Sequence, residues 1–293
     1  MSSKVAIAAV CMRVRYDTQA NMNTYQRFIE EAGDRGVRLL AFPECSLQGY
    51  TWTWDPVNCR FMPNDEQLRY FQENAEVVPG RATKIIGEEA KRHNMYIQFG
   101  MAEKAGPKVY NSAVLVGPTG LVGVYRKVHM APNPIFSSGD RFSVFHTELG
   151  KIGPVICADI QYPESVRCLA IDGAEIVVNS TAHPKREYLG LAYELLTQVN
   201  ALSNQVWMVH SDQIGQADGR GLECYGHSRI VDPMGHVVID TGYEEGLALA
   251  EVDLQGELMR CRGPEFAGRH LLQGRRPEAY HALCSNRQGR TPP

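Results

Sequence analysis

The 293-residue sequence contains no long hydrophobic run, no block of five or more like charges and no low-complexity linker. No stretch approaches the roughly 18 apolar residues of a transmembrane helix, and the first apolar segment is too short for a signal peptide. Lys and Arg number 30 against 33 Asp and Glu, so the charge pattern gives no support for a nucleic-acid or membrane partner. We therefore expect a cytoplasmic protein.

The eight cysteines form no pattern typical of a disulfide framework or a zinc site. No CxxC pair is present, and no histidines cluster beside the cysteines at metal-ligand spacing. In a chain of this size the cysteines are expected to be reduced thiols, most of them small buried hydrophobic residues. The position of a cysteine must therefore show whether it is reactive.

Apolar stretches with strand-like spacing alternate with stretches of helical periodicity, which is typical of a layered α/β fold. The strand-like stretches are bounded by Gly, Pro or polar residues, and Pro163 suits the first turn of a helix. The predicted strands cover about 4–12, 37–44, 95–103, 175–180 and 206–211, and the predicted helices about 18–35, 81–94, 163–172 and 186–205.

Two stretches share one pattern, a serine, an apolar strand, a Pro-x-Gly turn and a second apolar strand. They are 112–126 and 228–242. Each predicts a hairpin, and together they indicate two related half-sheets packed face to face with helices outside. We expect one domain over 1–293, with a core of about 4–254 and a Gly- and Arg-rich C-terminal arm of about 255–293 that covers a neighbouring surface.

Three reactive residues lie at the ends of predicted strands, where α/β folds usually build their sites. They are Glu44 in "LLAFPEC", Lys127 in "YRKVH" and Cys157 in "VICAD". A partly desolvated carboxylate suits a general base, and a thiol at a strand-to-helix turn can use nearby N–H groups as an oxyanion hole. Together the three could supply a nucleophile, a proton relay and a cation for a tetrahedral oxyanion.

Each of the three residues also has an ordinary structural interpretation. Glu44 could cap a turn, Lys127 could be solvated and Cys157 could fill a core, so local sequence leaves all three open. A papain-like pairing of the cysteine with His129, His183, His210 or His227 ranks lower, because none of these histidines has a local signature.

The motifs around these three residues, together with a fourth motif in the second predicted hairpin, resemble the nitrilase superfamily of carbon-nitrogen hydrolases, in the amidase and carbamoylase branch. The Glu-Lys-Cys order is the same, and the resemblance runs from about residue 4 to 254. The matching stretches are "FPECSLQGY", "YRKVHM", "GPVICADIQYPESVR" and "YGHSRIVDPMGHVV". Each motif alone is weak, but four in the correct order are specific.

The resemblance implies a four-layer α-β-β-α sandwich of two mixed sheets. It also implies that Glu44 is the general base, that Lys127 stabilises the tetrahedral intermediate and that Cys157 forms a thioester with release of ammonia or an amine. The N–H of Ala158 would assist Lys127. No metal or organic cofactor is implied, and family members commonly assemble as dimers or larger homo-oligomers.

Two departures from the family pattern concern the substrate. The stretch "KVHMAPNPIFSSGDRF" has no glutamate before Gly139, where many members carry a second one. Ile160 and Gln161 stand where carbamoyl-D-amino-acid hydrolases have an arginine pair, which argues against that substrate unless Arg167 or another arginine substitutes. The "CAD" sequence favours amides over nitriles.

Further residues near these motifs are candidate substrate contacts. His183 follows a strand expected beside that of Cys157, and it either faces the substrate or occupies a turn. Tyr50, Trp52 and Trp54 either line the site or pack in the core. Asp159 is expected to be a turn or capping residue, and Glu164 is expected to serve the start of the next helix.

The predicted activity is hydrolysis of a small amide or N-carbamoyl substrate. The alternatives are a nitrilase, an acyl transferase with the same three residues, and a catalytically silent homologue that binds a metabolite or partner. The missing glutamate motivates the last of these, and the intact Glu-Lys-Cys set opposes it.

Overall fold

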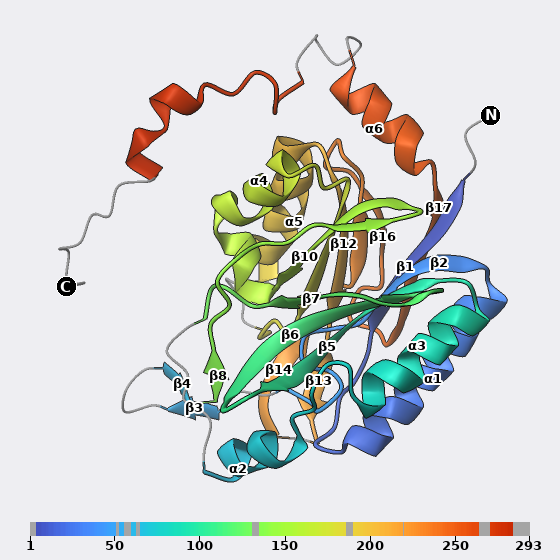
Figure 1. Ribbon diagram of the computed structural model, residues 1–293, viewed down its shortest axis with the longest axis vertical. Helices are drawn as coiled ribbons and strands as arrows, with labels where there is room; N and C mark the ends of the chain where they lie inside the picture. The colour runs from blue at the N-terminus through green and yellow to red at the C-terminus, as the bar shows by residue number, and fades with distance from the viewer. Residues whose placement is uncertain are drawn as a thin grey trace.

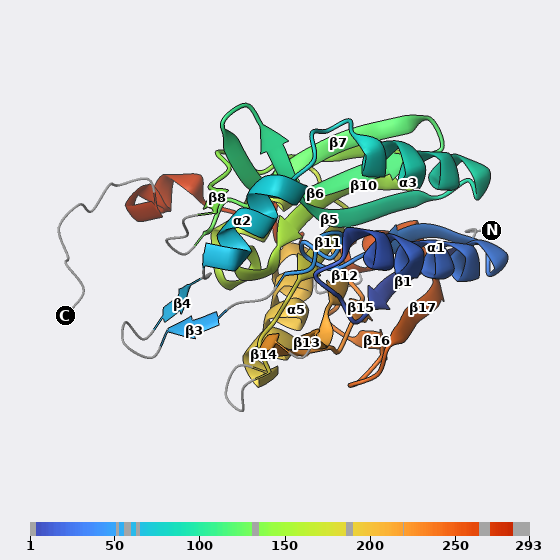
Figure 2. The same cartoon turned by 90° about the horizontal axis from the view of Figure 1, so that it is seen from below.

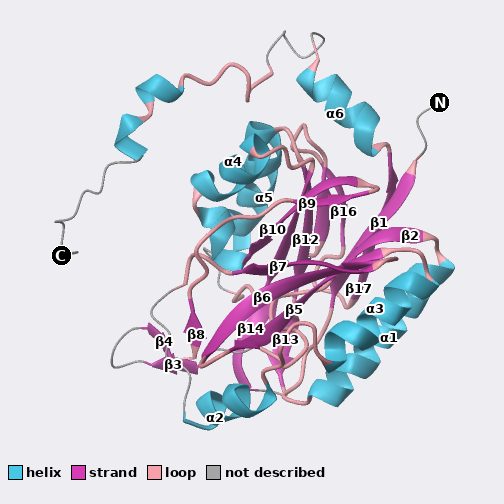
Figure 3. Ribbon diagram, viewed as in Figure 1, coloured by secondary structure: helices cyan, strands magenta, loops and turns pink. Residues whose placement is uncertain are grey.

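The computed structural model describes most of the chain. The described residues are 4–50, 53–55, 60–62, 65–130, 135–185, 190–218, 220–263 and 270–283. Within them, two large mixed β-sheets pack face to face, and helices cover the outer face of each sheet (Figures 1 and 3).

The first sheet combines strands from the start and the end of the chain. Its strands, in spatial order, are β17 (Gly246–Val252), β1 (Val5–Cys11), β2 (Val37–Ala41), β5 (Tyr96–Ala105), β6 (Lys108–Gly117) and β7 (Gly120–Arg126), with β8 (Phe136–Ser137) paired to β6. The neighbours β1, β2 and β5 run parallel, and β6 and β7 continue as an antiparallel hairpin.

The second sheet repeats this plan. Its strands, in spatial order, are β16 (Val237–Asp240), β15 (Arg229–Val231), β12 (Trp207–Asp212), β11 (Ile176–Thr181), β10 (Gly150–Ile156) and β9 (Phe145–Thr147). The neighbours β10, β11 and β12 run parallel, and β15 and β16 form the antiparallel hairpin. Both predicted hairpins are confirmed, as is the prediction of two related half-sheets.

The remaining elements are helices and two short ribbons. The helices are α1 (Thr18–Asp34), α2 (Asp65–Asn74), α3 (Arg81–Arg92), α4 (Pro163–Ile171), α5 (Gly190–Asn204) and α6 (Leu254–Arg262), with short 3₁₀ turns at η1 (Cys157–Gln161), η2 (Pro277–Ala279) and η3 (His281–Leu283). The ribbons pair β3 (Thr53–Asp55) with β4 (Arg60–Met62), and β13 (Ile214–Ala217) with β14 (Arg220–Tyr225).

Side-chain alternation along the strands creates the four layers. On β1, Ile7 and Ala9 face the second sheet, whereas Ala8 and Val10 pack toward α1 and α3. This period of two is what a strand buried on both faces requires. The order helix, sheet, sheet, helix is visible when the molecule is turned (Figure 2). The predicted α-β-β-α sandwich is therefore confirmed.

Polar side chains join the two sheets near the ends of β2, β5 and β11. Gln98 Nε2 donates to the Val178 carbonyl at 3.3 Å and to Ser180 Oγ at 3.1 Å, and Ser180 Oγ donates to the Phe42 carbonyl at 2.8 Å. All these groups are buried, so their hydrogen bonds fix how the sheets meet at this end.

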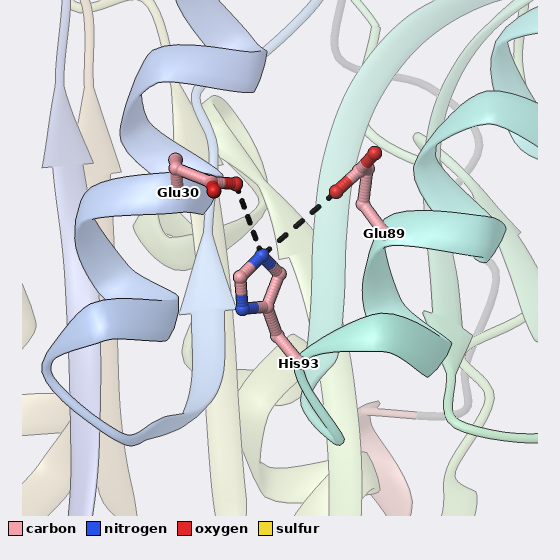
Figure 4. Close-up of side chains that lie close together, drawn as sticks. All are labelled: Glu30, Glu89 and His93. Atoms are coloured by element: carbon pink, nitrogen blue, oxygen red, sulfur yellow. Dashed lines mark hydrogen bonds and ion pairs between the residues drawn. The ribbon is translucent and has the colours of Figure 1, made fainter.

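A partly exposed cluster of side chains connects α1 with the C-terminal end of α3. Glu30, Glu89 and His93 are, within the described ranges, the one group whose possible metal-ligand atoms all lie within 4.8 Å of one another (Figure 4). His93 Nε2 lies 3.2 Å from Glu30 Oε2, but Arg92 already pairs with both carboxylates. Arg92 therefore supplies the positive charge here, and the cluster is a surface ion-pair network.

The first part of the C-terminal segment, helix α6, packs into the core. On α6, Leu254 and Leu258 pack into the layer between the sheets, and Trp207 Nε1 donates to the Leu254 carbonyl at 3.1 Å. Beyond it, residues 270–283 form the short turns η2 and η3. None of the helices in the described part of the chain is long and apolar enough to span a bilayer.

Gly100 on β5 allows the chain after β2 to pass very close to the first sheet. A Cβ atom on Gly100 would lie 2.3 Å from the Pro43 carbonyl oxygen and 2.5 Å from the Cys45 nitrogen. These are backbone atoms, which a side-chain rotation cannot move away, so only glycine fits here. Gly100 therefore sets the path of the turn that contains Glu44.

We predict that Gly100→Ala lowers the free energy of unfolding by about 1–3 kcal/mol, the usual cost of overpacking. Gly87→Ala is the matched control, because its added Cβ on α3 would meet no atom within 4 Å. Alanine favours a helix more than glycine, so this control should gain up to about 1 kcal/mol. Urea denaturation measures both variants, and an unchanged midpoint for Gly100→Ala would contradict the close approach.

Candidate active site

Glu44, Lys127 and Cys157 emerge from three different strands at one end of the two sheets. Glu44 follows β2, Lys127 follows β7, and Cys157 follows β10 as the first residue of η1. All three side chains are buried. The structure thus brings together the three residues that the sequence singled out at strand ends.

Glu44 and Lys127 form a buried ion pair. Lys127 Nζ donates to Glu44 Oε1 at 2.7 Å, and Glu44 has no exposed surface. Asn111 Nδ2 donates to the same oxygen at 2.6 Å, and the Ala182 N–H donates to Glu44 Oε2 at 3.1 Å. Both carboxylate oxygens are therefore satisfied, as a buried charge requires.

The carboxylate keeps the lysine charged. Burial alone disfavours the ammonium, but the charge of Glu44, followed by the proximity of Cys157, outweighs this effect and raises the pKa of Lys127 above its usual value. Lys127 is therefore a fixed cation and a hydrogen-bond donor, and it cannot act as a base near neutral pH.

Cys157 occupies a tight turn with a left-handed backbone. Its φ is +47°, and its N–H donates to Asn179 Oδ1 at 2.9 Å. Burial, followed by the charge of Glu44, raises the pKa of the thiol from 9.0 to about 11, against the opposing effect of Lys127. The resting thiol is therefore protonated at neutral pH, and it needs a base to become a nucleophile.

A chain of hydrogen bonds across three strands holds the cysteine backbone. Asn179 on β11 accepts from the Cys157 N–H, and its Nδ2 donates to His210 Nδ1 on β12 at 2.9 Å. Burial, followed by Arg229, keeps the pKa of His210 well below its usual value. His210 is therefore a neutral acceptor, which orients the amide of Asn179 toward Cys157.

Asp159 ties the cysteine turn to the segment after Lys127. Its carboxylate accepts from the Ile156 N–H at 3.0 Å and from the Tyr125 hydroxyl at 2.6 Å. The His129 N–H donates to the other oxygen at 2.9 Å. The prediction of a capping role is confirmed, although Asp159 is fully buried and also connects two parts of the site.

Ala158 is the second residue of the η1 turn, and its side chain is half-buried. An N–H in the first turn of a helix has no acceptor within that helix. The Cys157 N–H already donates to Asn179, so of these two N–H groups the one on Ala158 is better suited to stabilise an oxyanion. Glu164 lies in the first turn of α4, which confirms its predicted place at a helix start.

Tyr50 lies beside the site in a small aromatic cluster. It packs against Phe71 and Phe136, with ring centroids 6.5 and 6.0 Å away. Burial, followed by the charge of Glu44, raises the pKa of its hydroxyl well above the usual range. Trp52 and the side chain of Trp54 lie outside the described residues.

His183 packs against Tyr193, which in turn contacts Cys157. Its ring stacks on Tyr193 at 3.6 Å, and Tyr193 Oη lies 3.7 Å from Cys157 Sγ. Burial lowers the pKa of His183 to about 3, so the ring is neutral. Neither ring nitrogen has a hydrogen-bond partner within the described part of the chain. Such buried polar atoms are rare and can be available to a ligand.

The two residues in place of the arginine pair have different roles. Ile160 is fully buried in the core beneath α4 and α5. Gln161 Nε2 donates to Tyr193 Oη at 2.6 Å. Arg167 donates to the Ser203 carbonyl at 2.7 Å and lines a cavity of about 470 Å³ between α4 and residues 271–283.

Sequence reasoning missed three residues that support the site: Asn111, Asn179 and Tyr193. The two asparagines lie inside strands and meet their partners only through sheet pairing. Tyr193 lies in a helix whose apolar pattern suggests core packing. The one available signal was the presence of polar residues inside otherwise apolar strands.

Comparison with known proteins agrees with this arrangement. The family model described as carbon-nitrogen hydrolase matches residues 4–257. A nitrilase of Pyrococcus abyssi is 35% identical over 239 residues, covering 80% of this chain and 84% of its own. An omega-amidase of Xenopus laevis is 33% identical over 253 residues, covering 80% and 83%.

Solved structures give the same fold. An amidase from a Nesterenkonia species superimposes with a TM-score of 0.75 at 22% identity, covering 97% of each chain. Glu44, Lys127 and Cys157 lie within the span of the family model. The chain belongs to the carbon-nitrogen hydrolase family.

Proposed function

We propose that this protein is a cysteine-dependent amidohydrolase that cleaves a small linear amide or N-carbamoyl substrate. The observation that carries the proposal is the buried Glu44–Lys127 pair, which lies close enough to the Cys157 thiol to influence its pKa. A carboxylate, a permanent cation and a thiol in one enclosed site are the groups that acyl transfer requires.

In the first half of the reaction, Glu44 takes the thiol proton as Cys157 Sγ attacks the substrate carbonyl. The C–S bond forms, and the carbonyl oxygen becomes an oxyanion that Lys127 Nζ and the Ala158 N–H stabilise. As the intermediate collapses, the C–N bond breaks and the nitrogen takes the proton from Glu44. Ammonia or an amine leaves, and Cys157 carries the acyl group as a thioester.

In the second half, Glu44 removes a proton from water, which attacks the thioester carbonyl. The C–S bond breaks and the thiolate recovers the proton from Glu44, so the site returns to its starting state. The raised pKa of Lys127 supports this division of roles, because the lysine stays charged while Glu44 exchanges protons.

Amides are favoured over nitriles for two reasons. Asp159 occupies the second position after the cysteine, where amidases have an aspartate, and a solved structure of a mutant Nesterenkonia amidase shows covalent addition of the acetamide moiety of fluoroacetamide at the active-site cysteine of that enzyme. The second candidate is a nitrilase, because the Pyrococcus abyssi relative has that name. An acyl transferase and a silent binding homologue stay as alternatives.

We assign the substrate contacts to Ala158, His183 and Tyr50. Support comes from the N–H position of Ala158, from the ring nitrogens of His183, which have no hydrogen-bond partner among the described residues, and from the proximity of Tyr50 to Glu44. No metal or cofactor enters this proposal.

Assembly and location are also proposed. One side of α5 exposes Leu195, Val199 and Leu202 by 51, 55 and 40%. Residues at this spacing share a helix face, and an apolar face of this kind suits a contact between copies. We propose a cytoplasmic homo-oligomer, a dimer or larger, in which 1–293 is one catalytic unit with a C-terminal arm.

The first test removes the nucleophile. We predict that Cys157→Ala abolishes ammonia release from simple aliphatic amides. Cys168→Ser should keep full activity, because Cys168 is exposed on the outer helix α4. Ammonia release is measured in parallel from matched amide and nitrile substrates. Turnover of the nitrile alone would favour the nitrilase, and activity in Cys157→Ala would refute the proposed nucleophile.

The second test separates the structural and chemical roles of the ion pair. We predict that Glu44→Gln and Lys127→Met each lower stability by about 3–5 kcal/mol, because each leaves a buried polar group or charge without its partner. The double variant should recover much of this loss and still be inactive. Denaturation curves and ammonia assays test this, and additive stability losses would contradict the direct pairing.

A further inference from the structure

Tyr193 lies in the first turn of α5 and reaches Cys157 from the second sheet's helical layer. Its side chain is buried, and its Oη lies 3.7 Å from Cys157 Sγ. The two atoms form a hydrogen bond in which either could be the donor. Thr181 and Tyr193 both lower the pKa of the thiol through side-chain hydrogen bonding, and Tyr193 approaches it from a helix.

The direction of this hydrogen bond follows from Gln161. Gln161 Nε2 donates to Tyr193 Oη at 2.6 Å, so the tyrosine oxygen is an acceptor there. The single hydroxyl hydrogen of Tyr193 is then left for another acceptor. Cys157 Sγ is the neighbouring group that can accept it, above all when the thiol has lost its proton.

The tyrosine ring is held in a fixed position. His183 stacks on it at 3.6 Å with an interplanar angle of 26°, and Tyr225 packs edge-on against His183 at 5.8 Å. Burial, followed by the proximity of Cys157, raises the pKa of the Tyr193 hydroxyl well above its usual value. Tyr193 therefore remains a neutral donor near neutral pH.

Other groups also influence the thiol. From the first sheet these are Glu44 and Lys127, and from the second sheet Thr181, with Tyr50 and Cys224 close by. Lys127 Nζ donates to Glu44 Oε1 at 2.7 Å, so its positive charge is shared between Glu44 and the thiolate. A second donor to the sulfur is therefore chemically useful.

We propose that Tyr193 is a catalytic residue whose hydroxyl, oriented by Gln161, donates a hydrogen bond to the Cys157 thiolate. This inference rests on the proposed function for the identity of the nucleophile. The thiol proton goes to Glu44, and Tyr193 keeps its own proton throughout. The hydrogen bond stabilises negative charge on sulfur before the C–S bond forms.

The test measures the reactivity of the thiol without any substrate. Wild type and Tyr193→Phe are treated with iodoacetamide between pH 6 and 11, and labelling of the Cys157 peptide is followed by mass spectrometry. A lost hydrogen bond to a charged group should slow labelling at pH 8 by about tenfold and move the pH profile upward by about one unit. Tyr225→Phe is the matched control and should label like wild type, because its hydroxyl donates to Glu194 instead.

A second variant keeps Tyr193 and replaces Gln161, the donor to its hydroxyl oxygen, with an acceptor. In Gln161→Glu the new carboxylate accepts the hydroxyl hydrogen of Tyr193 and turns it away from Cys157. Slower labelling, as in Tyr193→Phe, is expected, and this variant decides the matter if Tyr193→Phe does not fold. Wild-type labelling profiles in the folded variants would overturn the proposal.

The two proposals fail in different ways. If wild type releases no ammonia from any amide but Tyr193→Phe still shifts the labelling profile, the proposed function is wrong and the hydrogen bond from Tyr193 to Cys157 stands. If wild type hydrolyses amides and the labelling profile of Tyr193→Phe is unchanged, the role of Tyr193 is wrong and the function stands.

Discussion

The buried ion pair between Glu44 and Lys127 is the interaction on which the rest of the site depends. Removing two charges from water costs on the order of several kcal/mol per ion, so the pair needs good geometry and further hydrogen bonds. Asn111 and the Ala182 N–H supply them. Because Ala182 follows β11 of the second sheet, the carboxylate of the first sheet is fixed only when the two sheets have met.

The position and the protonation state of the Cys157 thiol also depend on contacts between different elements of the fold. Cys157 lies in a left-handed turn that Asn179, His210 and Asp159 hold from neighbouring elements. Burial and the nearby carboxylate keep it protonated at rest, with a pKa of about 11. In the proposed mechanism the thiol is therefore unreactive at rest, and it becomes a nucleophile when Glu44 takes its proton.

Much of this could be predicted from the sequence, because strand ends and hairpin turns are local features. The predicted sandwich and family are confirmed, and Glu44, Lys127 and Cys157 do meet, although their catalytic roles stay predictions. The supporting residues Asn111 and Tyr193 could not be predicted. Their partners are distant in the chain, and only sheet register and helix packing bring them together.

The central claim is that the acyl group passes through Cys157, and the direct measurement is mass spectrometry of wild-type enzyme quenched in acid during amide turnover. The account predicts a peptide containing Cys157 whose mass is increased by the acyl group, with the other cysteines unmodified. Ammonia release at full rate with an unmodified Cys157 peptide, or with the acyl group on another residue, would contradict it.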